Sequence, residues 1–455
     1  MIEFLPLIMF LAVCLVILLG YPVAFSLAGI AIAFAALGTA IGHFDMAFLQ
    51  ALPNRLYGTM VNQTLVAIPL FILMGIMLEK SRLAEDLLNN MAQLFGKVRG
   101  GLGISVVTVG ALLAASTGIV GATVVTMGLM SLPTMLNRRY NPAFAAGTIC
   151  ATGTLGQIIP PSIALVLLGD ILSTAYAQAQ LGMGIFAPKT VSVGDLFMGA
   201  VIPGLILVGC YCTYIWLYAW LRPENAPAAD EHESVETLAL LSSLAPPMLL
   251  IIAVLGSILS GIATPTEAAG VGALGASLLA LLRRQLSLQR LQQVLEGTVE
   301  VTAMVFMILI GAAIFSLVFR GFGGEELVTS MFASIPGGVV GATLAVMVVI
   351  FILGFILDFI EITFVVVPIV GPALLAMGVD PIWLGIMIAV NLQTSFLTPP
   401  FGFALFYLRG VAPKEVLTSD IYRGVMPYIG IQLAVLLLLA LWPNLVTWLP
   451  EQVFR

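Results

Sequence analysis

The sequence contains very few charged residues. Only 9% of its 455 residues are charged, whereas 60% are hydrophobic and the mean hydropathy is +1.12. Soluble globular proteins carry about a quarter charged residues, so the composition excludes that class and predicts a polytopic membrane protein. The formal net charge is −6 and no basic patch is present, which argues against a nucleic-acid partner.

Residues and motifs typical of enzymes are also scarce. The two histidines, His43 and His232, lie in or beside polar connections. The sequence has no HExxH, no CxxC pair, no GxxxxGK[ST] phosphate loop and no GxSxG elbow. These absences argue against an ATP-driven pump and a zinc or serine hydrolase, and we expect no cofactor. Four cysteines lie within apolar runs and are interpreted as small buried side chains: Cys14, Cys150, Cys210 and Cys212.

Long apolar runs fill nearly the whole chain. Runs of about 17 to 25 residues, the length that spans hydrocarbon as a helix, recur from Leu5 to Leu449 and suggest roughly a dozen spans or half-spans. The first segment, Met1 to Gly20, lacks a basic start and a small-residue cleavage site, so we expect a retained first helix.

The prolines reveal an internal repeat. Four prolines have a partner at one constant offset, because 372 − 133 = 381 − 142 = 399 − 160 = 400 − 161 = 239. A weaker match, AEDLLNNM at 84–91 with GEELVTSM at 324–331, lies at offset 240. The sequence therefore predicts two copies of one unit.

Each copy contains an apolar run of about 38 residues with an interruption near its middle. The interruptions are AASTGIVGAT at 114–123 and LGFILDFIEIT at 353–363. Such a run is either two full crossings or a re-entrant hairpin, and in both cases its ends face one compartment. Basic residues flank the first run, and the matching connection at 377–380 has none, so the positive-inside rule predicts inverted copies: Lys97, Arg99, Arg138 and Arg139. Inverted repeats with broken helices are typical of secondary transporters.

The repeat predicts a division of the chain into four parts. They are N-terminal scaffold helices at 1–60; a first repeat at 61–221, with an arm, hairpin 1 at about 100–137, a broken helix at 142–168 and a scaffold helix; an acidic loop with connecting scaffold helices at 222–297; and a second repeat at 298–455, with an arm, hairpin 2 at about 339–377, a broken helix at 381–408 and a C-terminal helix.

Adjacent prolines at Pro160-Pro161 and at 399–400 predict two helices broken within the membrane. Proline removes an N–H group and clashes with the preceding turn, and an unpaired backbone group in hydrocarbon costs several kcal/mol. The freed carbonyls around Gly156 to Ile159 suit a desolvated cation such as sodium, and the helix that restarts after Pro161 presents N–H groups that suit an anion.

Polar residues within apolar segments are candidates for function. Asp358 has two open interpretations, a cation or proton ligand and a satisfied structural carboxylate. Glu267 fits a capping box with Thr264. The candidates for substrate binding are Gln157, Ser162, Asn391, Gln393 and Asp358. Hydroxyl groups gather at the interruptions and breaks, although each of them alone is better explained by helix packing: Ser116, Thr117, Ser162, Thr394, Ser395 and Thr398.

At these residues the sequence resembles the large membrane subunit of tripartite ATP-independent periplasmic (TRAP) transporters, in the superfamily of ion-coupled anion transporters. The matching motifs extend over nearly the whole chain: LGYPVAFSLAG, IPLFILMGIMLEKS, GTLGQIIPPSI, TPTEAAG, GFILDF and FLTPPFGFALF. The resemblance implies an elevator-type permease of the bacterial inner membrane, with about eleven spanning helices and two re-entrant hairpins.

The resemblance also implies partners and ions. It implies a sodium gradient that drives import of an organic acid, a periplasmic substrate-binding protein that delivers the acid, and a small four-helix membrane subunit. Matching the motifs places one sodium site at Ser116 or Thr117 with Gly156, Ile159 and Pro161. The other sodium site falls at Gly354, Ser395, Thr398 and Phe401.

Two other functions remain open from the sequence. One is a stand-alone sodium/carboxylate symporter that needs no binding protein. The other is a membrane-embedded enzyme, for which the pair Asp358 and Glu361 lacks a histidine or cysteine companion.

Overall fold

The computed structural model describes residues 2–81, 83–228 and 237–453. Within these ranges the chain is helical and contains no strand, which confirms the all-α prediction. Nine of the described helices are long and apolar enough to cross a membrane, and five shorter apolar helices lie among them. Part of the acidic loop predicted at 222–236, residues 229–236, lies outside the described residues.

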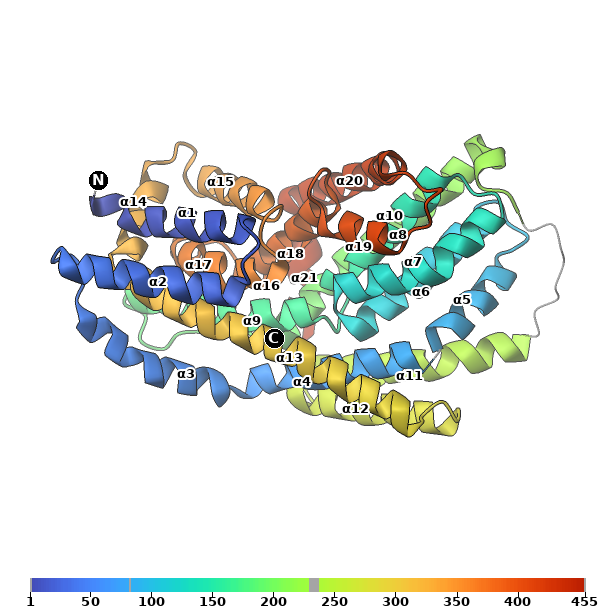
Figure 1. The fold of residues 1–455 in the computed structure, drawn as a ribbon, viewed down its shortest axis with the longest axis horizontal. Helices are drawn as coiled ribbons and strands as arrows, with labels where there is room; N and C mark the ends of the chain where they lie inside the picture. The colour runs from blue at the N-terminus through green and yellow to red at the C-terminus, as the bar shows by residue number, and fades with distance from the viewer. Residues whose placement is uncertain (1, 82, 229–236, 454–455) are drawn as a thin grey trace.

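One group of helices packs around the long helix α13. Helix α13 contacts α2 and α4, and α4 packs along α12; Figure 1 shows these blue and yellow helices side by side. The group comprises η1 (Ile2–Phe4), α1 (Leu5–Leu18), α2 (Val23–Ala40), η2 (Met46–Ala51), α3 (Leu52–Met60), α4 (Gln63–Lys80), α11 (Thr237–Leu259), α12 (Pro265–Leu282) and α13 (Leu288–Gly321).

The start of α12 has the predicted capping box. The N–H group of Thr264 donates to the Glu267 carboxylate over 2.8 Å, and the N–H group of Glu267 donates to the Thr264 hydroxyl over 3.3 Å. This reciprocal pair satisfies two N–H groups that the first helical turn leaves free, and it confirms the structural interpretation of Glu267.

Two helix pairs occupy the interrupted apolar runs. The first pair is α6 (Gly101–Thr117) and α7 (Val120–Asn137). The second is α15 (Gly338–Leu353) with α16 (Phe359–Glu361), the π-helical turn η5 (Ile362–Val366) and α17 (Val367–Ala376). In Figure 1 the α6–α7 pair and the α15–α17 pair lie toward opposite ends of the molecule.

The two Pro-Pro segments interrupt two helices between the pairs. The first runs as α8 (Pro142–Thr154), η3 (Leu155–Gln157) and α9 (Ile163–Gly182). The second runs as α18 (Pro381–Leu397) and α19 (Phe403–Val411). Both Pro-Pro peptide bonds are cis. We call residues 155–162 the first break and residues 398–402 the second break.

The remaining helices cover the breaks or connect the groups. Helix α20 packs against α8 and α18, and α8 comes so close that a Cβ on Gly147 would overlap the carbonyl of Gly424. Small residues permit such close approach in membrane proteins. The elements are α5 (Leu83–Leu94), α10 (Val193–Leu221), η4 (Pro223–Asn225), α14 (Gly324–Ser334), α20 (Thr418–Leu441) and α21 (Asn444–Val453).

Candidate functional site

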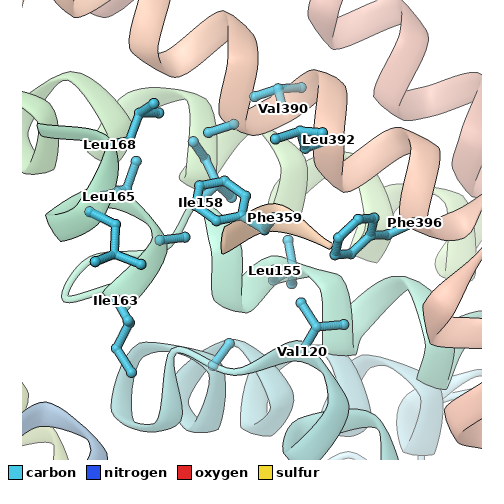
Figure 2. Close-up of a cluster of buried hydrophobic side chains, with 14 of the residues drawn as sticks. Val120, Leu155, Ile158, Ile163, Leu165, Leu168, Phe359, Val390, Leu392 and Phe396 are labelled. Atoms are coloured by element: carbon cyan, nitrogen blue, oxygen red, sulfur yellow. The ribbon is translucent and has the colours of Figure 1, made fainter. Parts of the chain in front are cut away.

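A cavity of about 160 Å³, called here the central cavity, lies where both helix pairs, both broken helices and α13 meet. Figure 2 shows four of its wall residues, Val120, Ile163, Phe359 and Phe396, converging from four different helices. The complete wall is formed by Ile72, Gly118, Ile119, Val120, Gly121, Gln157, Ile163, Ala164, Leu167, Val301, Met304, Val305, Asp358, Phe359, Ile360, Phe396 and Tyr407.

Equivalent positions of the two copies line the central cavity together. Four wall residues of the first copy have a wall partner at the offset of the prolines, because 358 − 119 = 359 − 120 = 360 − 121 = 396 − 157 = 239. The pairs are Ile119 with Asp358, Val120 with Phe359, Gly121 with Ile360, and Gln157 with Phe396. The cavity therefore lies between corresponding parts of the two copies, where transporters built from repeats place their substrate site.

Three helix N-termini meet at the central cavity. Helix α7 begins at Val120, α9 at Ile163 and α16 at Phe359, and all three residues belong to the wall. The residues before α7 and α9, Ile119 and Ser162, provide no side-chain cap. The first N–H groups of a helix lack intrahelical partners and carry partial positive charge. Two of the three N-termini can therefore donate to an anion.

Gln157 adds an amide group to the same wall. Its side chain is 2% exposed, and neither its nitrogen nor its oxygen has a hydrogen-bond partner among the described residues. Buried polar groups are nearly always hydrogen-bonded, and an unpaired one costs about 1–3 kcal/mol. An unpaired amide that lines a cavity is available to a ligand.

The third N-terminus already holds a carboxylate. Asp358 accepts a hydrogen bond of 2.7 Å from the N–H group of Phe359, and its own N–H group donates over 2.9 Å to Glu361. This capping box gives Asp358 a structural partner while its side chain still lines the central cavity. The capping box supports the structural interpretation of Asp358, and the role of this residue as a cation or proton ligand stays a prediction.

The other three substrate-binding candidates do not line the central cavity. Ser162 donates to the carbonyl of Gln157 over 3.0 Å and so bridges the first break. The Asn391 amide donates to the Met347 carbonyl over 2.7 Å and ties α18 to α15. The Gln393 amide donates to Thr154 over 3.3 Å. The structure thus brings Gln157 and Asp358 together and places the remaining three elsewhere.

The first predicted sodium site lies at the contact of the α6–α7 turn with the first break. A Cβ on Gly156 would lie 3.7 Å from the carbonyl oxygen of Ala114, close to the end of α6. The side chains of Ser116 and Thr117 lie outside the described residues. Within the described backbone, the carbonyls of Gly156, Ile159 and Pro161 receive no backbone hydrogen bond.

The second predicted sodium site shows a similar contact. A Cβ on Gly354 would overlap the Ser395 side chain, so the α15–α17 pair touches the end of α18 there. Ser395 and Thr398 donate their hydroxyl hydrogens to carbonyls within α18, over 2.9 and 2.8 Å. In the described backbone the carbonyls of Gly354 and Phe401 receive no backbone hydrogen bond.

A polar network behind the breaks was not predicted from the sequence. The Gln432 amide donates to the Tyr211 hydroxyl over 2.7 Å and to Thr154 over 3.4 Å, and Gln393 reaches the same threonine. A glutamine within the apolar run of α20 is a signal that could have identified Gln432. Tyr407, which lines the central cavity, gave no such signal because aromatic residues are common in apolar helices.

The fold is similar to that of solved membrane transporters. The chain aligns with the YdaH transporter of Alcanivorax borkumensis at a TM-score of 0.66 and 15% identity, covering 96% of this chain and 99% of that one. It aligns with MtrF of Neisseria gonorrhoeae at a TM-score of 0.60 and 14% identity, covering 87% and 83%. At such identity the likeness concerns the fold alone. The class that the fold and its nine long apolar helices define, over the described residues, is a polytopic helical membrane protein.

Sequence comparison identifies the family. The model for "Tripartite ATP-independent periplasmic transporter, DctM component" matches residues 8–445. The chain is 31% identical to the C4-dicarboxylate TRAP transporter large permease protein DctM of Rhodobacter capsulatus, covering 85% of this chain and 87% of that protein. It is 29% identical to the sialic acid TRAP transporter large permease protein SiaM of Vibrio cholerae, covering 95% of each.

This chain belongs to the DctM component family of TRAP transporters, as the motifs in its sequence predicted. It is the large permease subunit, a multi-pass protein of the bacterial inner membrane. The relatives are named as transporter permeases, so the alternative of a membrane-embedded enzyme is set aside.

Proposed function

We propose that this chain carries an organic acid across the inner membrane and holds the carboxylate of that acid in the central cavity. The observation that supports the proposal is the convergence there of the unpaired Gln157 amide and the uncapped N-termini of α7 and α9. Backbone N–H groups at helix N-termini form anion sites without further basic residues. Hydrogen bonds to a charged group contribute about 1.5–3 kcal/mol each.

The class of substrate is a small organic acid. The apolar part of the acid would contact Val120, Phe359 and Phe396, which line the same cavity. Relatives of similar identity are named for C4-dicarboxylates, for sialic acid and for ectoine. The proposal therefore extends to a carboxylate such as a C4-dicarboxylate or a sugar acid, and to no single compound.

Sodium is the coupling ion in this proposal. The unpaired carbonyls of both breaks would bind it, together with the hydroxyl groups of Ser395 and Thr398 and of Ser116 or Thr117. Neutral oxygen ligands suit an alkali metal cation, and a bound cation beside the central cavity would strengthen the attraction for a carboxylate. Sodium binding would therefore precede and favour binding of the acid.

Transport would proceed by an elevator motion. The block that holds both helix pairs and both broken helices would slide along the group around α13, and α5 and α14 would act as hinged arms. The wall of the central cavity supports this arrangement, because Ile72, Val301, Met304 and Val305 come from the α13 group and the other wall residues from the block. A sliding block would carry the acid away from these four apolar residues.

Two partners complete the transporter in this proposal. A periplasmic substrate-binding protein would deliver the acid, and a small four-helix membrane subunit would pack on the helices around α13. The family name itself describes a tripartite, periplasmic system.

Uptake by proteoliposomes tests the proposal. The complex of both membrane subunits is reconstituted, the loaded binding protein is added outside, and uptake of the radiolabelled acid is followed under an inward sodium gradient. We expect uptake that ceases when potassium replaces sodium. Undiminished uptake in potassium would contradict sodium coupling. Sodium-driven uptake without the binding protein would instead identify a stand-alone sodium/carboxylate symporter.

A further inference from the structure

A second cavity with polar wall residues, called here the vestibule, lies next to the central cavity along α9 and α13. It has a volume of about 370 Å³ and lies between α3, α4, α9, α13, α14, η5 and α17. Its polar wall residues are Arg55, Thr59, Asn62, Asp170, Thr174, Gln178, Ser316, Arg320 and Glu325.

Two helices, α9 and α13, line both cavities, one after the other along their length. On α9 the central cavity ends at Leu167 and the vestibule begins at Asp170. On α13 the central cavity ends at Val305 and the vestibule begins at Leu309. These steps of three and four residues are about one helical turn, roughly 4.5–6 Å at 1.5 Å per residue. The two cavities are therefore neighbours along both helices.

Both carboxylates of the vestibule are already hydrogen-bonded. The Glu325 carboxylate pairs with the Arg320 guanidinium group at 2.5 and 3.1 Å. It also accepts hydrogen bonds from the Gln178 amide at 3.2 and 3.3 Å. Asp170 receives the Asn62 amide at 3.0 and 3.2 Å. These two acids therefore have their own donors.

Arg55 in the same wall has no such partner. Among the described residues its guanidinium group forms no hydrogen bond and no ion pair, although the side chain is half-buried. Partial burial and the nearby charge of Arg320 lower the pKa of Arg55 from its usual value, and the charge of Glu325 opposes this shift. Arginine nevertheless stays protonated at neutral pH, so a guanidinium cation with no hydrogen-bonded acceptor among the described residues faces the vestibule near the Arg320–Glu325 pair.

We propose that the vestibule is a relay site in which Arg55 receives the carboxylate of the organic acid before the acid enters the central cavity. The inference rests on the proposed function and adds a second anion site to it. A guanidinium group presents two parallel N–H donors that match a carboxylate, and those of Arg55 have no acceptor among the described residues.

The vestibule lies on the side where the acid arrives. Arg320 is at the end of α13, whereas Arg283, Arg284 and Arg290 lie before or in its first turn. The positive-inside rule places those three arginines in the cytoplasm. The vestibule therefore faces the periplasm, from which a binding protein would release its acid.

Substitution of Arg55 in the reconstituted complex tests the inference. The variants are R55Q, R55K and R55A, with R423Q as a control that removes one exposed arginine from α20. The radiolabelled acid is the compound that raises the melting temperature of the partner binding protein in a panel that includes succinate and N-acetylneuraminate. Uptake is measured against the concentration of loaded binding protein.

We expect R55Q to lower the maximal rate about tenfold without changing the half-saturating concentration of binding protein. R55K, which keeps the charge and loses the two-pronged geometry, should fall between R55Q and the wild type, and R423Q should match the wild type. Methylguanidinium in the external buffer should raise the uptake rate of R55A at least threefold, because it replaces the missing donor. It would not rescue a misfolded protein.

If the wild-type complex shows sodium-driven uptake and the maximal rate of R55Q lies within twofold of it, the relay site is overturned and the proposed function stands. A higher half-saturating concentration of binding protein at an unchanged maximal rate would also overturn it, because Arg55 would then belong to the docking surface of that protein. Absence of any rescue in R55A, with R55K as inactive as R55Q, would assign Arg55 a purely structural role. A wild-type complex without sodium-driven uptake would overturn the proposed function itself.

Discussion

The two breaks have the same backbone feature, a Pro-Pro segment, but they differ in their burial. Both contain a cis Pro-Pro bond, but Pro160 and Pro161 are buried, whereas Pro400 is exposed and Phe401 is 56% exposed. At the first break Gln157 lines the central cavity, and its equivalent before the second break, Phe396 of α18, lines the same cavity with an apolar side chain. Equal sequence motifs therefore need not make equal contributions to one site.

Two equivalent residue pairs in the wall of the central cavity also differ between the copies. Gln157 of the first copy is equivalent to Phe396 and Ile119 to Asp358, and all four residues line the central cavity. Each of these two pairs combines one polar and one apolar residue. The central cavity consequently has an amide from the first copy and a carboxylate from the second.

Replacement of the wall pair Gln157 and Phe396 should show the largest difference between the copies. We expect Q157L to lower sodium-driven uptake about ten- to a hundredfold, because one hydrogen bond to a charged group contributes about 1.5–3 kcal/mol. The equivalent F396L should cost less than about fivefold, since it changes only apolar contact. Initial rates at a saturating concentration of binding protein measure both.

The melting temperature serves as the control for this pair. Q157L removes an amide that has no partner among the described residues, so it should not lower the melting temperature. Equal losses of uptake in Q157L and F396L would contradict the assignment of the amide to the acid.

The contact of each helix pair with its break provides the second comparison. Gly354 lies against Ser395, and the equivalent residues of the first copy are Ala115 and Gly156, because 354 − 115 = 395 − 156 = 239. We expect G354A to raise the half-saturating sodium concentration about tenfold, because its methyl group would overlap the serine side chain. The double variant G354A/S395G reproduces the residues of the first copy and should recover most of the affinity.

A double-mutant cycle of sodium-dependent uptake measures this coupling. The control is A115G, which removes a methyl group without adding one and should change the half-saturating sodium concentration by less than twofold. Additive effects of G354A and S395G would show that the two positions do not constrain each other.

Helices α9 and α19 provide a smaller contrast. Asp170 of α9 binds Asn62 of α4, whereas the equivalent Arg409 of α19 donates to the carbonyl of Val416, close by in sequence. We expect N62A to reduce the population of the present conformation about fivefold, because one hydrogen bond contributes about 1 kcal/mol. R409Q should leave this population unchanged. Spin-label distances between α4 and α9 report it, and equal shifts in both variants would contradict the assigned tether.

The hydroxyl groups that contact the breaks should show the smallest effects. Ser162 donates to Gln157 within a buried segment over 3.0 Å, and Tyr422 donates to the exposed Pro400 over 3.3 Å. S162A should lower the free energy of unfolding by about 1 kcal/mol, and Y422F by about 0.5 kcal/mol or less. Melting temperatures in detergent rank the two, and the reverse order would contradict the difference in burial.

The fold was predictable because the strongest signals were local. Proline pairs, a constant offset and a composition poor in charge are visible in a single sequence, and the two helix interruptions occur at the Pro-Pro segments that were predicted to break. The capping box of Thr264 and Glu267 is also local and was confirmed. The assignment to TRAP permeases followed from motifs that cover nearly the whole chain and was confirmed.

The site was less predictable because its chemistry depends on distant partners. Asn391 and Gln393 were candidates for substrate binding, yet they donate to Met347 and Thr154 and lie outside the cavity wall. No sequence pattern announces such a partner, since it comes from a helix 44 or 239 residues away. Arg55 is the opposite case, an ordinary arginine whose lack of a partner became visible only after the helices were placed.

The most direct test is a map of the complete complex with sodium and the transported acid bound. The account predicts density for a carboxylate in the central cavity, within hydrogen-bond distance of the Gln157 amide and of the first N–H groups of α9. A bound acid elsewhere, with Gln157 still unpaired in an empty cavity, would contradict it.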